Sequence, residues 1–265
     1  AMAGETNKLQ KYLDAIDSEF PLENDLVLTS GEQVTIGLLS SILNKKNIKA
    51  MPLLGWQIPI ITDDNYENAK ILNIDKNLIN SYFQKYNVLV LAGFQGVNKK
   101  GHITSLGRGG SDTTAVAIAS AVNAERCDIY TDVEGVYTAD PNLVNKAKKI
   151  PKVSFEEMLE MSSMGAKVLH TRSVELAMKN NLTLQVLSSL TKKKGTYILD
   201  EKNLIEKEIV SGVSYSKNES KITISGIPDK PGISAKIFGL MTQSNINVDM
   251  IVQNISQDGV FANIT

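Results

Sequence analysis

Arg108 lies among three glycines in the segment Ser-Leu-Gly-Arg-Gly-Gly-Ser-Asp, which covers residues 105–112. Glycine adopts positive φ and lets the backbone approach a ligand closely, because it has no Cβ. Residues 113–122 form an apolar run that we expect to be helical, with Ser111 or Asp112 as its N-cap. A helix N-terminus offers free backbone N–H groups and a positive dipole end, and Arg108 adds a cation. The segment predicts an anion site; a capped glycine turn without a ligand is the alternative.

Polar turns elsewhere in the chain carry further groups that could bind a ligand. They cover residues 4–7, 30–32 and 131–137, and Lys167 follows Gly165 at the start of another expected helix. The candidate side chains are hydroxyls (Thr6, Ser111), cations (Arg108, Lys167) and carboxylates (Glu32, Asp112, Asp132). Such a set suits a small zwitterion together with a polyphosphate, because cations hold anionic groups through charge-assisted hydrogen bonds.

Alternating strands and helices must position these turns. We expect strands at residues 50–54, 58–62, 88–93, 127–132 and 184–187, helices at 7–16, 33–43, 113–122, 155–162 and 166–180, and a turn at 27–32. The run at 88–93 is continuously apolar and ends in glycine, which indicates a strand buried on both faces. The pattern predicts an α/β fold, a mostly parallel sheet with helices on both faces. Ligands of such sheets bind at the carboxyl ends of the strands.

The pattern changes after a charged linker at residues 200–203. There we expect strands at 210–215, 221–225, 248–254 and 261–265 and a helix at 233–244. We predict two domains, 1–204 and 205–265. The chain opens on a glycine turn with no strand before it and stops inside an expected strand, so we expect that residues are missing at both ends.

Composition excludes several classes of function. The 265 residues have a formal net charge of -1, so no overall field favours nucleic acid or an anionic membrane. A single cysteine, Cys127, allows no internal disulfide and fits a reducing compartment. We expect no signal peptide and no apolar stretch approaching the roughly 18 residues that a membrane helix needs.

Five segments, in order along the chain, resemble the aspartate kinase family of the amino acid kinase superfamily. They are residues 1–7 (Ala-Met-Ala-Gly-Glu-Thr-Asn), 30–32 (Ser-Gly-Glu), 106–114 (Leu-Gly-Arg-Gly-Gly-Ser-Asp-Thr-Thr), 131–141 (Thr-Asp-Val-Glu-Gly-Val-Tyr-Thr-Ala-Asp-Pro) and 165–170 (Gly-Ala-Lys-Val-Leu-His). Residues 226–234 and 246–250 resemble the first regulatory ACT domain of such enzymes. One glycine loop would be weak evidence, whereas this ordered set covers almost the whole chain.

The resemblance implies transfer of the γ-phosphoryl group of ATP to the side-chain carboxylate of L-aspartate. It also implies roles for individual residues. Arg108 would clamp the α-carboxylate of aspartate, Glu32 would hold its ammonium group, and Asp112 would orient cationic groups near the transferred phosphoryl. Hydrogen bonds to the substrate would come from Thr6, Gly109, Gly110 and Ser111, and the ATP site would be lined by Thr131, Asp132, Tyr137, Lys167 and Val168. Lys167 would reach the phosphates, and Mg²⁺ would be held mostly by ATP and water.

The resemblance further implies feedback regulation in a cytoplasmic homo-oligomer that makes the first intermediate of lysine, threonine and methionine synthesis. An amino acid such as lysine or threonine would bind the ACT region. The residues implied are Asp229, Lys230, Pro231, Gly232, Ile233 and Ser234 in a loop and helix start, and Asn247, Val248, Asp249 and Gln253 on the facing strand. An ACT module that only dimerises is the alternative.

Three departures from the family pattern limit the resemblance. The family's opening strand with its Lys-Phe/Tyr-Gly-Gly loop is absent, and without that lysine the chain as given would be a very poor kinase. Asn142 stands where the family usually has arginine, which affects one phosphate contact. The ACT region lacks its end and the usual second module, so any regulatory site is partial.

Other interpretations stay open. Glu32 could be a first-turn helix acid, Asp112 a simple cap, Tyr137 a packing residue and Lys167 a solvated lysine. We interpret His102 and His170 as structural, because neither has a second histidine or cysteine at a metal-binding spacing. The protein could also be another amino acid kinase, such as a glutamate or acetylglutamate kinase, or a non-catalytic subunit that binds amino acids through the ACT module.

Overall fold

The computed structural model describes residues 2, 4–166, 168–203, 211–215, 222–228, 230, 232–243, 248, 251–255 and 261–264. The chain divides into two compact units, Ala1–Tyr215 and Ser216–Thr265, and each is described by itself. The domain boundary expected at residue 204 lies outside the described residues and stays a prediction.

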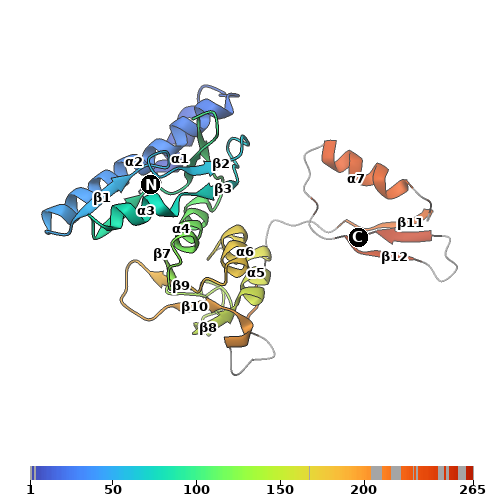
Figure 1. Ribbon diagram of the computed structural model, residues 1–265. Coiled ribbons are helices and arrows are strands. Elements are labelled where there is room, and N and C mark those ends of the chain that lie inside the picture. Colours follow the sequence, from blue (N-terminus) through green and yellow to red (C-terminus); the bar gives the residue numbers. More distant parts are fainter. Residues whose placement is uncertain are drawn as a thin grey trace. The chain divides into compact units, whose positions relative to one another are not determined.

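Two helices open the first unit, α1 (Glu5–Asp14) and α2 (Pro21–Lys45), and they pack on each other (Figure 1). The turn expected at residues 27–32 is wrong, because α2 continues through it. The Thr29 hydroxyl donates to the Asp25 carbonyl oxygen at 2.8 Å and the Ser30 hydroxyl to that of Val27 at 2.7 Å. These hydroxyls bond back to the preceding helical turn instead of capping a new helix.

Helix α2 also corrects the expectation about apolar stretches. It is 25 residues long and apolar enough to cross a membrane by length and composition, and 33% of its apolar window is buried inside the fold. The helix packs on β1, β4 and β6 and buries Asp25 and Glu32. The helix therefore packs on these strands through the part of its surface that carries the two buried carboxylates.

The strands next to α2 form two sheets. In the first, β1 (Ala50–Leu53) pairs in parallel with β4 (Val88–Leu91), as expected from the apolar runs. The second has the order β3-β2-β5-β6. Its members are β2 (Ile60–Thr62), β3 (Ile71–Ile74), β5 (Gln95–Val97) and β6 (Ile103–Ser105). The sequence did not predict the short strands β3, β5 and β6 or the eight-residue helix α3 (Lys76–Phe83), although Asp75 was an available cap signal for α3.

Helix α4 (Gly110–Ala121) leads from these sheets to a third sheet (Figure 1). This sheet has the order β7-β9-β10-β8, with β7 parallel to β9, β8 parallel to β10, and β9 antiparallel to β10. Its strands are β7 (Cys127–Thr131), β8 (Lys152–Ser154), β9 (Leu184–Ser188) and β10 (Thr196–Leu199). The first unit is therefore α/β, as predicted, with parallel pairs inside mixed sheets.

Helices α5 (Phe155–Ser163) and α6 (Thr171–Lys179) lie side by side and close the core against this sheet. Fully buried core side chains come from α4, α5, α6 and the strands: Val116, Val153, Met158, Val174, Leu184, Val186 and Ile198. Helix α6 begins five residues later than expected, because His170 is its N-cap and accepts a hydrogen bond from the Arg172 backbone N–H at 3.4 Å. Cys127 is buried at the start of β7, and burial raises the pKa of its thiol to about 11.

The second unit has one helix and three strands among its described residues. Strands β11 (Ile224–Pro228), β12 (Gln253–Ile255) and β13 (Phe261–Ile264) form an antiparallel sheet in the order β11-β13-β12, and α7 (Ile233–Gln243) precedes β12. The strand expected at 210–215 is wrong for residues 211–215, which belong to the first unit. There the Val213 backbone N–H donates to the Thr138 carbonyl oxygen at 2.8 Å, and the Ser211 hydroxyl donates to Glu157.

Candidate functional site

The glycine loop before α4 has the backbone geometry expected from its sequence, but a different cap. Gly107 and Gly109 have φ values of 72° and 68°, and Gly109 is the N-cap of α4. Ser111 and Asp112 therefore lie in the first helical turn, and the prediction that one of them is the cap is wrong. Glycine takes the cap because a Cβ at residue 109 would lie 2.3 Å from Cβ and Cγ of His170.

The loop leaves Arg108 and Ser111 exposed and packs Gly110 inward. A Cβ at residue 110 would lie 2.8 Å from Cδ2 of Phe94, so the start of α4 rests closely on the residue that precedes β5. The Gly110 backbone N–H donates to the Gly107 carbonyl oxygen at 3.0 Å. Arg108 and Ser111 thus offer their side chains to solvent, while the Gly110 N–H forms the turn that presents them.

Asp112 is half-buried on α4 next to the residue that caps α6. Burial raises the pKa of its carboxyl, while the charge of His170 and a hydrogen bond from the His170 backbone lower it. The segment between β4 and β5 also meets this turn, because the Phe94 backbone N–H donates to the Thr114 hydroxyl at 3.0 Å. Asp112 therefore lies where the segment between β4 and β5, α4 and the start of α6 come together.

Glu32 is on α2, about one helical turn beyond Thr29, and Thr29 is linked through Gln95 to the segment that contacts the glycine loop. The Glu32 side chain is 9% exposed. The buried Gln95 amide bridges α2 and the end of β1: it donates to the Thr29 carbonyl oxygen at 3.3 Å and accepts from the Gly55 backbone N–H at 3.4 Å. Because residue 94 contacts Gly110, α2 and the glycine loop are joined through two consecutive residues. Thr6, in contrast, is exposed in the first turn of α1 rather than at its cap, which is Gly4.

A buried carboxylate on α2 was not predicted from the sequence. Asp25 is fully buried and accepts hydrogen bonds from the Ser105 backbone N–H at 2.8 Å, the Ser105 hydroxyl at 2.6 Å and the Glu67 backbone N–H at 3.0 Å. Burial raises the pKa of Asp25, and the hydrogen bonds from Ser105 and Glu67 lower it. An acidic residue inside an apolar helix was the available signal.

Thr131 and Asp132, two of the residues expected at the nucleotide, lie at one edge of the third sheet, where the carboxyl ends of β7 and β9 meet. Thr131 ends β7, and its hydroxyl donates to the Asp132 carboxylate at 3.0 Å. The Thr131 carbonyl oxygen accepts from the backbone N–H of Ser189 at 2.8 Å. Because β7 and β9 are parallel, with Thr131 opposite Ser188, their carboxyl ends lie together, which is where α/β sheets bind ligands.

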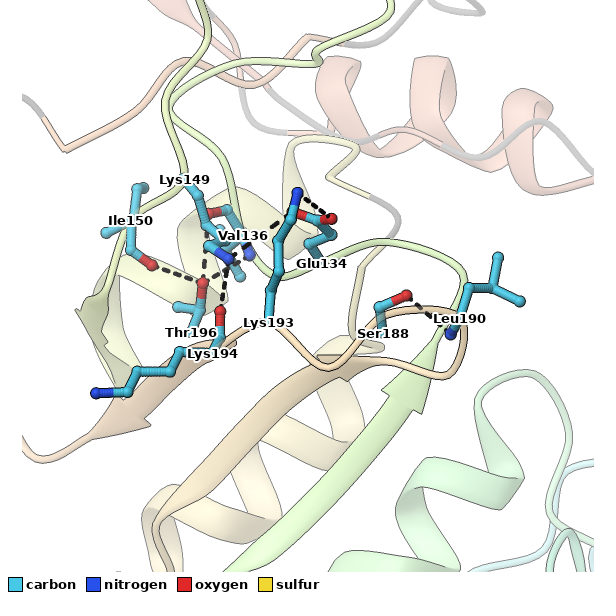
Figure 2. A network of polar contacts seen from close by, with 9 residues as sticks. All are labelled: Glu134, Val136, Lys149, Ile150, Ser188, Leu190, Lys193, Lys194 and Thr196. Carbon is cyan, nitrogen blue, oxygen red and sulfur yellow. Dashed lines mark hydrogen bonds and ion pairs between the residues drawn. The ribbon is translucent and has the colours of Figure 1, made fainter.

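A network of polar contacts borders this edge (Figure 2). Lys193 Nζ lies 2.8 Å and Lys149 Nζ 3.9 Å from the Glu134 carboxylate. The hydrogen bond from Lys193 is the main reason that the pKa of Glu134 is lowered. The buried Thr196 hydroxyl accepts from the Val136 backbone N–H at 2.8 Å and donates to the Ile150 carbonyl oxygen at 2.6 Å, as Figure 2 shows. This network was not predicted from the sequence, although the lysine run at residues 192–194 was a signal for it.

Two other residues assigned to the nucleotide are partly buried. Tyr137 forms an isolated antiparallel bridge with Lys149, and Val168 packs on the hydrophobic core of the third sheet. Lys167 lies outside the described residues. Asn142 is exposed, and its backbone N–H donates to the Asp140 carboxylate at 2.9 Å.

The second unit contains the residues expected to bind an effector. Gly232 has a φ of 93° and directly precedes α7, whose first two residues, Ile233 and Ser234, are half-buried. Lys230, Val248 and Gln253 are exposed, and Gln253 begins β12. Asp229, Pro231, Asn247 and Asp249 lie outside the described residues.

No group of three or more histidine, cysteine, aspartate or glutamate side chains that could hold a metal occurs in the part of the chain that the structure describes. His102 accepts from or donates to the Tyr66 hydroxyl at 2.9 Å, and His170 caps α6, so both histidines have structural contacts.

Family models match both parts of the chain. The model of the amino acid kinase family matches residues 2–188, and the model of the ACT domain matches residues 222–265. Relatives include an aspartate kinase of Pseudomonas fluorescens, 49% identical over 97% of the chain and 63% of the relative. An aspartokinase of Pseudomonas aeruginosa is 48% identical over the same shares, and one of Helicobacter pylori is 44% identical over 98% of the chain and 65% of the relative. The chain therefore spans less than two thirds of the length of these relatives.

Solved structures of aspartate kinases are also similar to this chain. Escherichia coli aspartokinase III in complex with aspartate and ADP is 26% identical, with a TM-score of 0.69 over 100% of the chain and 60% of that structure. The same enzyme in complex with lysine and aspartate has a TM-score of 0.69 over 98% of the chain and 60% of that structure. An aspartate kinase from Synechocystis is 33% identical, with a TM-score of 0.67 over 100% of the chain and 45% of that structure.

Proposed function

Because this chain belongs to the amino acid kinase family, we propose that it is part of an aspartate kinase. The full-length enzyme transfers the γ-phosphoryl group of ATP to the side-chain carboxylate of L-aspartate and forms 4-phospho-L-aspartate. The aspartate kinases that are 48–49% identical over 97% of the chain support the substrate, and so does the likeness to a structure containing aspartate and ADP.

The reaction needs positive charge and positioning more than proton transfer. The attacking carboxylate is already ionised at pH 7, so no general base is required. The difficulty is to bring one anion to another, which fixed donors and cations overcome. Exposed Arg108, presented between two glycines in the left-handed region, is the observation that supports the proposal most. Its guanidinium group clamps the α-carboxylate of aspartate with two parallel hydrogen bonds.

The other substrate contacts come from α2 and the first turn of α4. Glu32 holds the ammonium group of aspartate, and the low exposure of its carboxylate strengthens that attraction. Ser111 and the backbone around Gly109 and Gly110 bind the substrate carboxylates, and Thr6 adds a hydroxyl from α1. Asp112 orients the cationic groups around the transferred phosphoryl group.

ATP binds at the carboxyl ends of β7 and β9. Thr131, Asp132, Tyr137 and Val168 line this site, and Lys167 contacts the phosphates. The polar groups at this edge and the nearby lysines of Figure 2 are chemically suited to a polyphosphate. When bound, Mg²⁺ would neutralise phosphate charge, and ATP and water would supply most of its ligands.

The second unit regulates the kinase as part of an ACT module in a cytoplasmic homo-oligomer. Lysine or threonine binds near the start of α7, at the residues assigned above, and favours one arrangement of the enzyme over another. The likeness to a structure in complex with lysine and aspartate supports this class of effector. Inhibition of the full-length enzyme by added lysine or threonine tests this part of the proposal.

Kinetics of an Arg108→Ala variant test the role of the glycine loop. In the full-length enzyme, we expect KM for aspartate to rise at least about tenfold and KM for ATP to change less than about twofold, because one charge-assisted clamp is lost from the acceptor alone. An Arg126→Ala variant is a matched control, since Arg126 pairs with Asp128 at the amino end of β7, the opposite end of that strand from Thr131. Equal changes for aspartate and ATP in the Arg108 variant would assign Arg108 another role.

A further inference from the structure

We propose that Arg172, on α6, is a positioning residue that fixes the loop carrying Arg108. The inference about the loop stands on geometry, whereas its kinetic consequence rests on the proposed aspartate kinase function. Arg172 is one residue beyond the start of α6 and belongs to none of the polar turns that the sequence analysis singled out.

The guanidinium group of Arg172 joins two loops that are far apart in the sequence. Nη1 donates to the Leu106 carbonyl oxygen at 2.8 Å, and Nη2 donates to the Ala69 carbonyl oxygen at 2.7 Å. Leu106 is fully buried and lies two residues before Arg108, and Ala69 is fully buried before β3. Both contacts go to backbone oxygens, so they fix the course of the main chain whatever side chains stand there.

Burying the Arg172 guanidinium costs free energy, and only well-aligned hydrogen bonds offset that cost. Burial lowers the pKa of Arg172, and the charge of Asp63 acts in the opposite direction. A planar guanidinium has donors in a fixed fork, which matches two carbonyl oxygens better than an ammonium group does. A half-buried arginine that bonds two buried carbonyls is thus a specific link between loops.

Asp25, a buried carboxylate on α2, also bonds both of these segments. Asp25 accepts from the backbone of Ser105 and of Glu67, the residues that precede Leu106 and Ala69 by one and two positions. The Ala69 backbone N–H donates to the Ser105 carbonyl oxygen at 2.9 Å. A Cβ at Gly107 would lie 2.9 Å from the Glu67 carbonyl oxygen. The Asp25 carboxylate on α2 and the Arg172 guanidinium on α6 therefore both bond the place where residues 67–69 meet residues 105–107. We call this place the junction.

The junction leads directly to the candidate catalytic loop. Arg108 follows Leu106 by two residues, and Gly109 lies against the His170 side chain, which precedes Arg172 by two residues. Loss of the Arg172 guanidinium leaves two buried carbonyl oxygens without their donor and frees the loop to shift. A shift of about 1 Å in a substrate clamp can cost about 10²-fold in rate.

A groove beside Arg172 makes the proposal directly testable. A cavity of about 940 Å³ opens between β3, α4 and α6, and Arg172 is among the residues that line it. In an Arg172→Ala variant, a small guanidinium ion from solvent can therefore enter the place of the lost group. Methylguanidinium is the probe, and methylammonium, with the same charge but no planar fork, is the control ion.

The experiment compares full-length wild type with Arg172→Ala, Arg172→Lys and Arg126→Ala. Arg126 is the control because it is an arginine that bonds a carboxylate, Asp128, on another sheet. We expect Arg172→Ala to raise KM for aspartate about tenfold or more and KM for ATP less than about twofold, with Arg172→Lys in between. Methylguanidinium restores at least a third of the lost kcat/KM for aspartate, and methylammonium does not.

Hydrogen exchange gives a readout that does not depend on the reaction. We expect faster amide exchange in residues 66–70 and 105–112 of Arg172→Ala and unchanged exchange in β7 and β9. Unchanged exchange in both segments, or equal changes in KM for aspartate and ATP without rescue, would overturn the positioning role. If wild type releases no ADP with aspartate while exchange still rises in both segments, the proposed function fails and the link through Arg172 stands.

Discussion

At the residue scale, the candidate site combines groups with two different tasks. Arg108 and Ser111 are exposed and available to a ligand, whereas Asp25 and Arg172 bond backbone groups and shape the loop from behind. The first pair could be predicted from the sequence, because polar residues among glycines ahead of an apolar run indicate a ligand-binding loop before a helix, and this pattern involves only neighbouring residues. The second pair could not, because their partners are 42 to 103 positions away in the chain.

A Gly109→Ala variant tests the close packing of the loop. Gly109 has a φ of 68°, and an added Cβ would meet the His170 side chain at 2.3 Å. We expect the free energy of unfolding to fall by at least about 1 kcal/mol, because the left-handed conformation alone costs that much for alanine. We also expect KM for aspartate to rise, since the displaced backbone carries Arg108.

Gly37→Ala is the matched control for this variant. Gly37 is exposed inside α2, and a Cβ there would meet nothing within 4 Å. Alanine at that position should stabilise the helix by about 0.5–1 kcal/mol, and the kinetics should not change. Chemical denaturation gives both stabilities. A Gly109→Ala variant as stable as wild type would show that the loop and His170 are not packed as described.

At the element scale, long apolar runs were predicted well and short strands were not. Strands β1, β4, β7 and β9 and helices α5 and α7 lie close to their expected positions, because each has a clear apolar pattern. Residues 27–32 were mistaken for a turn because serine, glycine and threonine occur there together, yet their hydroxyls bond the helix backbone. The late start of α6 depends on a histidine cap, which residue type alone does not indicate.

The pH dependence of stability tests the contact between α2 and the end of β6. Burial raises the pKa of Asp25 in the folded state above its ordinary value of 3.8. The folded protein therefore holds this proton more tightly than the unfolded chain does, and the contribution of Asp25 to stability falls as pH rises from about 3.8 through the raised pKa. We expect Asp25→Asn to lose this part of the slope, although it is less stable overall, because an amide cannot accept all three hydrogen bonds.

Urea midpoints of wild type and Asp25→Asn between pH 4 and pH 7 measure the effect. Asp75→Asn is the control, since Asp75 caps α3 and accepts bonds from two backbone N–H groups at an exposed position, 3.0 Å each. Parallel pH profiles for wild type and the Asp25 variant would mean that this carboxylate titrates alike in the folded and unfolded states.

At the scale of the whole molecule, the two compact units match two different family models. The ordered motifs of the chain resemble both families already at the level of the sequence, and the two family models confirm that resemblance. The networks around Asp25, Arg172 and Glu134 became visible only when segments distant in sequence were placed together.

The most direct test of the central claim is coupled-assay ADP release by the full-length protein with ATP and Mg²⁺. We expect ADP release to require L-aspartate and not to be supported by L-glutamate, and we expect Arg108→Ala to lose affinity for aspartate. ADP release that is equal with both amino acids would assign the protein to another acceptor. No aspartate-dependent release from correctly folded full-length protein would contradict the aspartate kinase function itself.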